Sequence, residues 1–261
     1  MTLLGIIASS MQYSAPPPVS GYKLWLDAAD SSQITASGGD VSQWSDKSGF
    51  ASNFTQPTGA NQPKTGTRSI NGKNVIDFDG VNDSLFCASS TALFKYLHSS
   101  TGGTTFVVGV VDNTAADKQL FATCGFASSV IGVNMQISSL EKTNIGIFRG
   151  VSSNSTAISS DTNTLTAGSA FYLTTKFDGG NATAANRILS SLNGGAFAGF
   201  NTLTNAASSS NATNDMRLGE EPPGGVNPLD GAIGEIIIYE GILSGPNITS
   251  VQGYLAAKWG I

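Results

Sequence analysis

"GEIIIYEG", residues 234–241, combines three consecutive isoleucines with a tyrosine and has a glutamate near each end. β-branched and aromatic side chains suit a pleated strand, and an apolar run without alternation indicates a strand buried on both faces. Glu235 and Glu240 lie five residues apart, a spacing that directs the side chains of a regular strand to opposite faces. The stretch therefore predicts a central strand of an all-β protein, with Glu235 in a structural role and Glu240 as a turn charge.

The overall composition agrees with a chain of short strands and tight turns. Of its 261 residues 31 are glycine, only 12% are charged and 40% are hydrophobic. Glycine supplies turn conformations that other residues avoid, and the hydrophobic share is large enough for a packed core. These values favour a folded β protein with little helix.

Runs of β-branched and aromatic residues recur between clusters of Gly, Asn, Asp and Ser. In "NVIDFDG", residues 74–80, Ile76 and Phe78 share one face while Asp77 and Asp79 share the other, as expected of a strand with one solvated face. No fixed repeat and no interior linker divides the chain, which predicts one domain over residues 21–261. The predicted strands are 22–26, 75–78, 104–111, 119–124, 144–148, 171–177, 187–192, 216–218 and 232–239.

The C-terminal stretch "SGPNITSVQGYLAAKWGI", residues 244–261, predicts the one convincing helix. Ser244 is suited to cap its start, Pro246 to its first turn and Gly260 to its end. Apolar residues at spacings of three and four give it one apolar face. They are Ile248, Val251, Leu255 and Trp259. We expect this short helix to close an edge or end of the β structure.

Residues 1–20 read as an extended N-terminal arm followed by a proline-rich spacer, because Pro16, Pro17 and Pro18 stiffen the chain. No Lys or Arg precedes Lys23, so a secretory signal is not expected, and the apolar stretch is too short to cross a bilayer. The arm is instead predicted to anchor the chain to a partner protein. Its anchoring residues would be Leu3, Leu4, Ile6 and Ile7.

The charge argues against a nucleic-acid partner. The formal net charge is −5, and the 13 Lys and Arg residues are scattered singly instead of forming a basic surface. Cys87 and Cys124 leave two alternatives open, a disulfide between neighbouring strands or two buried free thiols, of which the thiols are the commoner outcome.

Several stretches together resemble the concanavalin A-like lectin and glucanase superfamily, in particular laminin-G-like domains of bacterial surface proteins and of phage virion proteins. The resemblance spans residues 21–261 and implies a jelly-roll sandwich of two antiparallel sheets. The stretches are "LWLDAADSS" (24–32), "VSQWSDKSG" (41–49), "NVIDFDGVNDSL" (74–85), "TTFVVGVV" (104–111), "FYLTTKFDGG" (171–180), "RILSSLNGG" (187–195), "DGAIGEIIIYEGILS" (230–244) and "VQGYLAAKWG" (251–260).

The opening "MTLLGIIASS" is similar to the short apolar starts of structural proteins in tailed phages. This second resemblance implies a protein of the virion surface, such as a capsid decoration, a head fibre or a tail fibre component. Its partners would be other virion proteins, reached through the arm, with further copies of the chain in a homo-oligomer.

Glucanases of the superfamily carry their catalytic acids as Glu-x-Asp-x-x-Glu or Glu-x-Asp-x-Glu, because retaining hydrolysis needs two carboxyl groups about 5 Å apart. Glu235 and Glu240 match the outer positions of the longer form, but Ile237 stands where the aspartate belongs. Only a bulge in the strand would bring the two glutamates to one face. His98, the only histidine, has no nucleophile motif to go with it and is expected in a surface loop. We therefore expect no catalytic residues and no enzyme.

Metal and ligand candidates are few. One histidine and two distant cysteines cannot supply a normal zinc site. The turn "DFDGVNDS" gathers oxygen ligands that calcium prefers, although Gly80 and Ala88 break the EF-hand pattern, and a plain hairpin turn is the alternative. Its candidate calcium ligands are Asp77, Asp79, Asn82 and Asp83. Trp44, in a polar segment, is the one tryptophan that we consider as a sugar platform, and a small structural plug is the favoured alternative for it. Trp25 and Trp259 are predicted core residues. No cofactor is expected.

Three functions of different classes remain. The first is a non-enzymatic structural protein of a phage surface. The second is a carbohydrate-binding adhesin or lectin module, on the same particle or on a bacterial surface protein, and the third is a glycoside hydrolase. The first two are compatible, and a concave site with exposed aromatic side chains would favour glycan binding. The hydrolase requires a carboxylate pair that the sequence does not supply.

Overall fold

The computed structural model describes residues 15–127, 129–150 and 157–261. Among these residues no helix has the length and apolar character that a membrane span requires. The four arm residues that we expect to anchor a partner, Leu3, Leu4, Ile6 and Ile7, lie outside the described residues.

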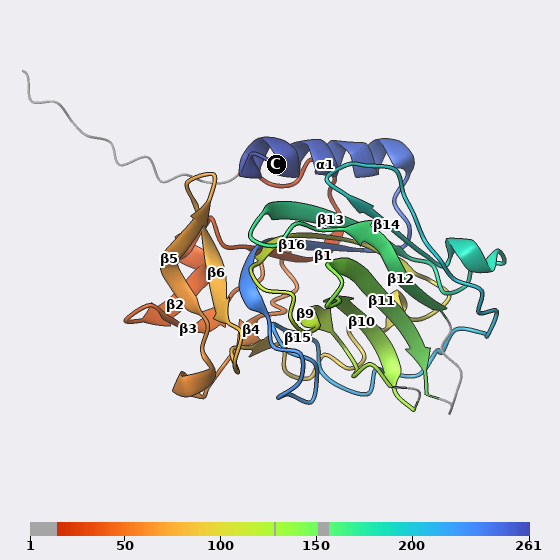
Figure 1. Cartoon of the computed structure of the whole chain (residues 1–261), viewed down its shortest axis with the longest axis horizontal. Coiled ribbons are helices and arrows are strands. Elements are labelled where there is room, and N and C mark those ends of the chain that lie inside the picture. Colours follow the sequence, from red (N-terminus) through yellow and green to blue (C-terminus); the bar gives the residue numbers. More distant parts are fainter. Residues whose placement is uncertain (1–14, 128, 151–156) are drawn as a thin grey trace, which may run out of the picture.

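The described chain is all-β with one C-terminal helix, as predicted (Figure 1). The strands are β1 (Tyr22–Asp27), β2 (Ile34–Ser37), β3 (Asp40–Trp44), β4 (Phe54–Thr55), β5 (Lys64–Ile70), β6 (Lys73–Asp79), β7 (Leu85–Phe86), β8 (Gly103–Val111), β9 (Lys118–Ala122), β10 (Ile131–Ile137), β11 (Lys142–Arg149), β12 (Ala157–Thr164), β13 (Ala170–Phe177), β14 (Ile188–Leu192), β15 (Arg217–Leu218) and β16 (Asp230–Glu240). The helix α1 is Gly245–Trp259.

The strands form one continuous antiparallel sheet in the order β12-β11-β10-β9-β15-β7-β4-β3-β5-β6-β16-β8-β13-β14, with β1 paired to β16 and β2 to β3. The two ends of this path approach each other, because Asn163 Nδ2 of β12 donates to Ser190 Oγ of β14 at 2.7 Å. The sheet is therefore barrel-like and nearly closed. The two separate sheets of the predicted jelly roll are not confirmed. The two-residue strands β4, β7 and β15 form a continuous line of hydrogen-bonded strands between β3 and β9, so the sheet is not divided in two.

Strand β16 is central, which confirms the prediction from its sequence. It pairs with β8 over most of its length, and on its other side it pairs first with β6 and then with β1. The pairing shifts at Gly234, where a β-bulge allows the ring of Trp259 to occupy the space that a Cβ would need. A larger residue at 234 would collide with that ring.

The bulge changes which side chains of β16 face which core. Ile233, Ile236 and Ile238 face the main core inside the curved sheet. Ile237 and Tyr239 instead belong to a second core on the outer face of the sheet. Each of these side chains is buried, and burying an isoleucine contributes about 1.5–3 kcal/mol. One strand therefore holds two cores together.

Helix α1 covers the second core, and Figure 1 shows it lying along one side of the sheet next to β13 and β14. Its start and end follow the predicted signals: Ser244 Oγ accepts from the backbone N–H of Asn247, and Gly260 adopts the left-handed conformation that ends the helix. The four predicted apolar residues are its buried ones: Ile248, Val251, Leu255 and Trp259.

A fully buried carboxylate joins this helix to the sheet. Glu235 accepts hydrogen bonds from Trp25 Nε1 of β1 at 2.8 Å and from three groups of α1, namely Tyr254 Oη at 2.9 Å, Lys258 Nζ at 2.8 Å and Trp259 Nε1 at 2.7 Å. We call these five residues the Glu235 junction. Burial raises the pKa of Glu235, while the charge of Lys258 acts in the opposite direction.

The junction continues into a chain of ion pairs. Lys258 Nζ also lies 2.7 Å from Asp27 Oδ1, and Asp27 Oδ2 accepts from Lys47 Nζ at 3.2 Å. Each buried charge thus has a partner of the opposite sign, which buried ion pairs require. Among the described residues, Asp27 and Lys258 each have two such partners, whereas Glu235 has Lys258 alone.

We predict that Glu235→Ala lowers the free energy of unfolding by about 3–5 kcal/mol, because it leaves both indole N–H groups without their acceptor and leaves Lys258 with Asp27 as its one carboxylate partner in the described chain. Chemical denaturation of the purified protein measures this. The control is Glu240→Ala, at the exposed end of the same strand, which should change stability by less than about 1 kcal/mol. Equal effects of the two substitutions would contradict the role given to the junction.

Candidate functional site

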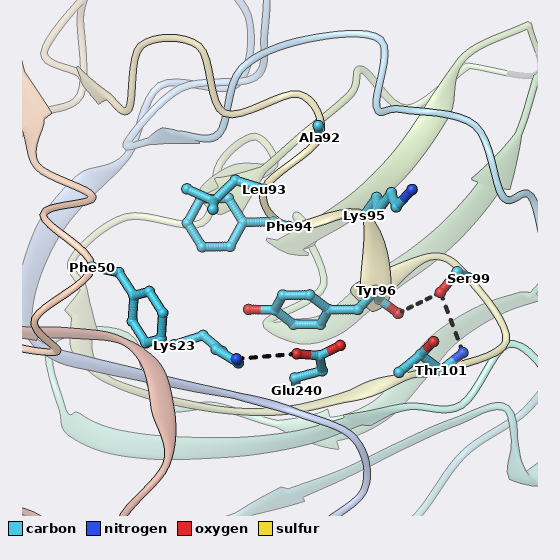
Figure 2. Close-up of a pocket in the computed structure, with 10 residues that line it drawn as sticks. All are labelled: Lys23, Phe50, Ala92, Leu93, Phe94, Lys95, Tyr96, Ser99, Thr101 and Glu240. Atoms are coloured by element: carbon cyan, nitrogen blue, oxygen red, sulfur yellow. Dashed lines mark hydrogen bonds and ion pairs between the residues drawn. The ribbon is translucent and has the colours of Figure 1, made fainter.

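A pocket of about 250 Å³ opens beside the N-terminal half of β1 and the C-terminal end of β16 (Figure 2). Its walls come from four segments of the chain: Lys23 of β1, the loop that carries Phe50, residues 92–101, and Glu240 of β16. The third segment includes a short 3-10 turn, Lys95–Leu97, which holds Tyr96. The pocket therefore exists only once β1 and β16 have paired.

One wall of the pocket is aromatic and apolar. Phe50 is 56% exposed and Leu93 44%, whereas Phe94 beneath them is buried. The ring of Phe94 contacts that of Tyr96 edge to face, with centroids 6.4 Å apart. An exposed phenylalanine beside a hollow keeps apolar surface in contact with water, and a ligand with an apolar face would cover it.

The opposite wall is charged. Lys23 Nζ lies 3.3 Å from Glu240 Oε2, and the same ammonium is 4.9 Å from the centroid of the Phe50 ring. Both members of the ion pair are partly exposed, so the pair itself contributes at most about 1 kcal/mol. Its donors and acceptors remain accessible to a polar ligand.

Tyr96 supplies the most unusual group of the pocket. Its side chain is buried, and its hydroxyl has no hydrogen-bond partner among the described residues. Figure 2 shows this hydroxyl pointing away from the turn, toward the space between Phe50 and Phe94. Burial raises the pKa of Tyr96, and the charge of Glu240 raises it further, so the hydroxyl stays protonated. It can therefore both donate and accept a hydrogen bond.

Leaving a buried hydroxyl unpaired costs about 1–3 kcal/mol, so a partner that arrived with a ligand would recover that free energy. Together the walls offer an aromatic face, an unpaired hydroxyl and a charged rim. This combination suits a ring that has an apolar face and hydroxyl groups on its edge.

The two glutamates of β16 do not form a carboxylate pair. Glu235 lies in the junction beneath α1, whereas Glu240 lines the pocket. A bulge is present in this strand, but it precedes Glu235 and leaves the regular spacing from Glu235 to Glu240 intact. The two side chains therefore point to opposite faces, as predicted.

Trp44 is fully buried in the main core, opposite Phe54 of β4. This placement removes it from the candidate sugar platforms, because no face of its ring reaches solvent. The burial of Trp44 could not be predicted from its polar sequence neighbours, because the apolar residues that pack against it come from other strands. Trp25 and Trp259 are buried in the second core, as expected.

The predicted calcium candidates cap a turn. Asp79 Oδ1 accepts from the backbone N–H groups of Val81 and Asn82, and Asp83 Oδ2 accepts from the N–H of Asp79 at 2.9 Å. Asp77 faces outward and accepts from Thr67 Oγ1. Within residues 15–127, 129–150 and 157–261, no three Asp, Glu, His or Cys side chains gather as a metal site. Asp79 and Asp83 thus hold the turn through backbone N–H groups, which fits the hairpin-turn alternative, and calcium binding stays an untested hypothesis.

The remaining sequence candidates are structural. His98 is fully buried, not in an exposed loop as expected, and its Nε2 lies 2.9 Å from the carbonyl oxygen of Ser210; burial lowers its pKa. Cys87 and Cys124 are buried free thiols, which decides between the two alternatives left open by the sequence. Burial raises the pKa of Cys87 to about 11, so this thiol stays protonated and unreactive.

The sequence analysis missed the residues of the pocket. Phe50, Tyr96 and Glu240 are far apart in the chain, and only the complete fold brings their segments together. One usable signal was present: Phe50 is the single aromatic residue in the polar stretch "SDKSGFASN", residues 45–53. A lone aromatic residue in a polar loop suggests an exposed ring, but Trp44, directly before this polar stretch, is fully buried, so this signal alone does not identify the pocket.

No protein-family model matches the sequence, and no curated protein matches it either. Solved structures do match the fold. The sialidase of Trypanosoma rangeli in complex with sialic acid aligns with a TM-score of 0.60 and 12% identity, over 94% of this chain and 34% of that chain. This chain thus spans about a third of the length of that sialidase.

A second match is the CBM40 of the Ruminococcus gnavus IT-sialidase bound to α2,6-sialyllactose. It aligns with a TM-score of 0.53 and 15% identity, over 69% of this chain and 96% of that chain. At such identities the likeness concerns the fold alone. The chain has a β-rich, lectin-like fold, and the resemblance to phage virion proteins stays a prediction.

The Asp83 turn gives a pH-dependent prediction. Burial, together with the charges of Asp79 and Asp77, raises the pKa of Asp83 to about 6, against about 3.9 in an unfolded chain. A raised folded pKa adds stability below pH 4 that is lost as the pH rises through 6. Asp83→Asn removes this loss while its amide oxygen still accepts from Asp79 N–H. The stability of the wild type relative to D83N should therefore fall by about 1 kcal/mol from pH 4 to pH 7, after allowance for solvent screening.

Urea denaturation of both proteins at several pH values measures the difference. A difference that stays constant from pH 4 to pH 7 would contradict the raised pKa. Millimolar Ca²⁺ should leave both melting temperatures unchanged, and a calcium-dependent rise in the wild type alone would show that these acids bind metal instead of capping the turn.

Proposed function

We propose that this protein is a non-enzymatic glycan-binding module and that the pocket of Figure 2 holds one sugar residue. The observation that carries the proposal is the buried, unpartnered hydroxyl of Tyr96 beside the exposed ring of Phe50. The lectin-like fold supports it, since a carbohydrate-binding module with a bound sialyllactose has the same fold.

Sugar chemistry fits the pocket on both of its walls. The C–H face of a pyranose ring would cover Phe50 and Leu93, whose apolar surface is otherwise in water. A hydroxyl of the sugar would pair with the Tyr96 hydroxyl, and neighbouring hydroxyls would reach the carboxylate of Glu240 or the ammonium of Lys23. Such a ligand satisfies polar and apolar groups at once.

The placement of the glutamates supports binding without cleavage. Retaining hydrolysis needs two carboxyl groups that flank the glycosidic bond, about 5 Å apart. Glu235 is enclosed by four donors beneath α1, and Glu240 faces the pocket without a second carboxylate among its lining residues. A glycoside hydrolase therefore remains the least supported of the three functions.

The test is a glycan array followed by calorimetry with the best oligosaccharide. Phe50→Ala should weaken binding about tenfold or more, since it removes the apolar platform. Tyr96→Phe should also weaken binding, yet it should stabilise the free protein by about 1 kcal/mol because it removes an unpaired buried hydroxyl. A merely structural tyrosine would not give these opposite changes.

The matched control is Phe200→Ala, which removes another exposed phenylalanine, 67% exposed and outside the pocket, and should leave binding unchanged. The proposal fails if the wild type binds no glycan. It also fails if Phe50→Ala and Tyr96→Phe both bind as tightly as the wild type.

The virion role is a further part of the proposal. We propose that the module is displayed on a phage surface as a decoration or fibre component and anchored by residues 1–20; an adhesin of a bacterial surface protein is the alternative. The end of the spacer is tied to the domain, because Tyr239 Oη donates to the carbonyl oxygen of Val19 at 2.7 Å. A tether fixed to the second core would hold the domain at a defined orientation.

Deleting residues 1–18 in a phage that encodes the chain should abolish incorporation into particles and leave the domain folded, since Val19 and the second core remain. Immunoblots of purified particles and circular dichroism of the truncated protein measure the two effects. Unchanged incorporation would contradict anchoring by the arm.

A further inference from the structure

A second hollow, of about 230 Å³, lies on the outer face of the sheet at β7 and β15. It shares no lining residue with the pocket of Figure 2. Its walls are Phe86, Asn214, Asp215, Arg217, Pro222 and Pro223. Arg217 pairs with Phe86 and with Ala122 across the sheet, while the next residues, Leu218 and Leu85, face the main core. The arginine therefore points away from the core.

Arg217 is held in place on one edge and open on the other. Its Nη1 donates to Glu220 Oε2 at 3.1 Å and to Ser84 Oγ at 3.0 Å, and both acceptor residues are buried. The guanidinium carbon lies 5.4 Å from the centroid of the Phe86 ring. Nη2 and Nε have no partner within the described ranges. A guanidinium fixed in this way offers N–H groups to a ligand at little entropic cost.

The other polar groups of the hollow supply acceptors and a second donor. The carboxylate of Asp215 is oriented by the backbone N–H groups of Ser89 at 3.0 Å and Ser90 at 2.6 Å. Asn214 is fixed by its backbone N–H, which donates to the carbonyl of Thr123 at 3.0 Å. Its side-chain amide finds no partner in the part of the chain that the structure describes. Pro222 and Pro223 add an apolar wall.

The charges decide which ligand fits. Arg217 and Asp215 line the hollow with one charge of each sign. Glu220 lies outside the lining but pairs with Arg217 and adds a second negative charge, so the three groups together are negative. A carboxylate would meet this negative charge at close range. Hydroxyl groups, in contrast, can accept from Arg217, donate to Asp215 and do both with the amide of Asn214.

From these groups we infer that the hollow beside Arg217 is a second binding site, which takes a neutral sugar residue and disfavours acidic sugars. The inference rests on the proposed function in that both sites take glycans, but it depends on different residues. The chain would then contact a glycan, or two glycans, at two places, and the two contacts would add avidity.

The test is NMR titration of the ¹⁵N-labelled full chain with methyl glycosides of galactose, mannose and N-acetylglucosamine, and separately with glucuronic acid and N-acetylneuraminic acid. A neutral glycoside should shift the Nε–H signal of Arg217 and the side-chain amide signals of Asn214. Asn214→Ala should raise the Kd measured at the Arg217 signal about fivefold, because one or two hydrogen bonds are lost. This substitution leaves the backbone contact to Thr123 in place, so folding is preserved.

The matched control is Asn211→Ala, an exposed asparagine three residues away and outside the hollow, which should not change the Kd. No shift at Arg217 with any neutral glycoside overturns the inference, as does binding of the acidic sugars at least as tight as that of the neutral ones.

Phe50→Ala separates this inference from the proposed function. It should abolish shifts in the pocket of Figure 2 and leave those at Arg217 unchanged. Shifts at Arg217 alone would contradict the proposed pocket and support the second site. Chemical shift changes in the pocket alone would support the proposed pocket and contradict the second site.

Discussion

The structure depends on a carboxylate that has no contact with solvent. Glu235 accepts from an indole of β1 and from an indole, a hydroxyl and an ammonium of α1, so a single side chain links strand pairing to helix docking. Leaving any of these donors unsatisfied in the interior would be costly, which fixes the face to which Glu235 points. Because the strand continues regularly from there, Glu240 must emerge on the other face and reach the pocket.

The same constraint explains why the first glutamate of a glucanase-like spacing, Glu235, has a structural role here. A catalytic carboxylate needs access to substrate, whereas a carboxylate that ties two elements together needs complete enclosure. Gly234 permits the enclosure, since its missing side chain makes room for the ring of Trp259. The bulge at that residue determines to which face of the sheet each following side chain of β16 points. It thereby determines which isoleucines lie in the main core and which lies in the second core.

Local sequence patterns predicted those strands and helices whose burial and ends are indicated by their own residues. The isoleucine run became the central strand, and the capping signals at Ser244 and Gly260 marked both ends of α1. Sheet closure was not predictable in the same way, because β4, β7 and β15 are two residues long and have no periodicity to read. His98 was predicted in a surface loop, and Trp44 was considered as a sugar platform because its sequence neighbours are polar, yet distant strands and loops bury both.

Both candidate sites were beyond sequence reasoning for a related reason. Each combines an aromatic ring with polar groups that the rest of the described chain leaves unpaired: the Tyr96 hydroxyl in one site, and the amide of Asn214 with the open edge of Arg217 in the other. Whether a polar atom is paired depends on every segment packed around it. Such atoms become visible only after the fold is known, and they then indicate what a ligand must provide.

The central claim is that the face of β16 opposite the Glu235 junction holds a sugar without cutting it. A crystal structure of the protein soaked with the oligosaccharide that it binds best tests this most directly. The account predicts an intact saccharide whose ring lies on Phe50 and whose hydroxyl contacts the oxygen of Tyr96, while the Glu235 junction stays closed. A cleaved saccharide, or one that lies against an opened Glu235, would contradict it.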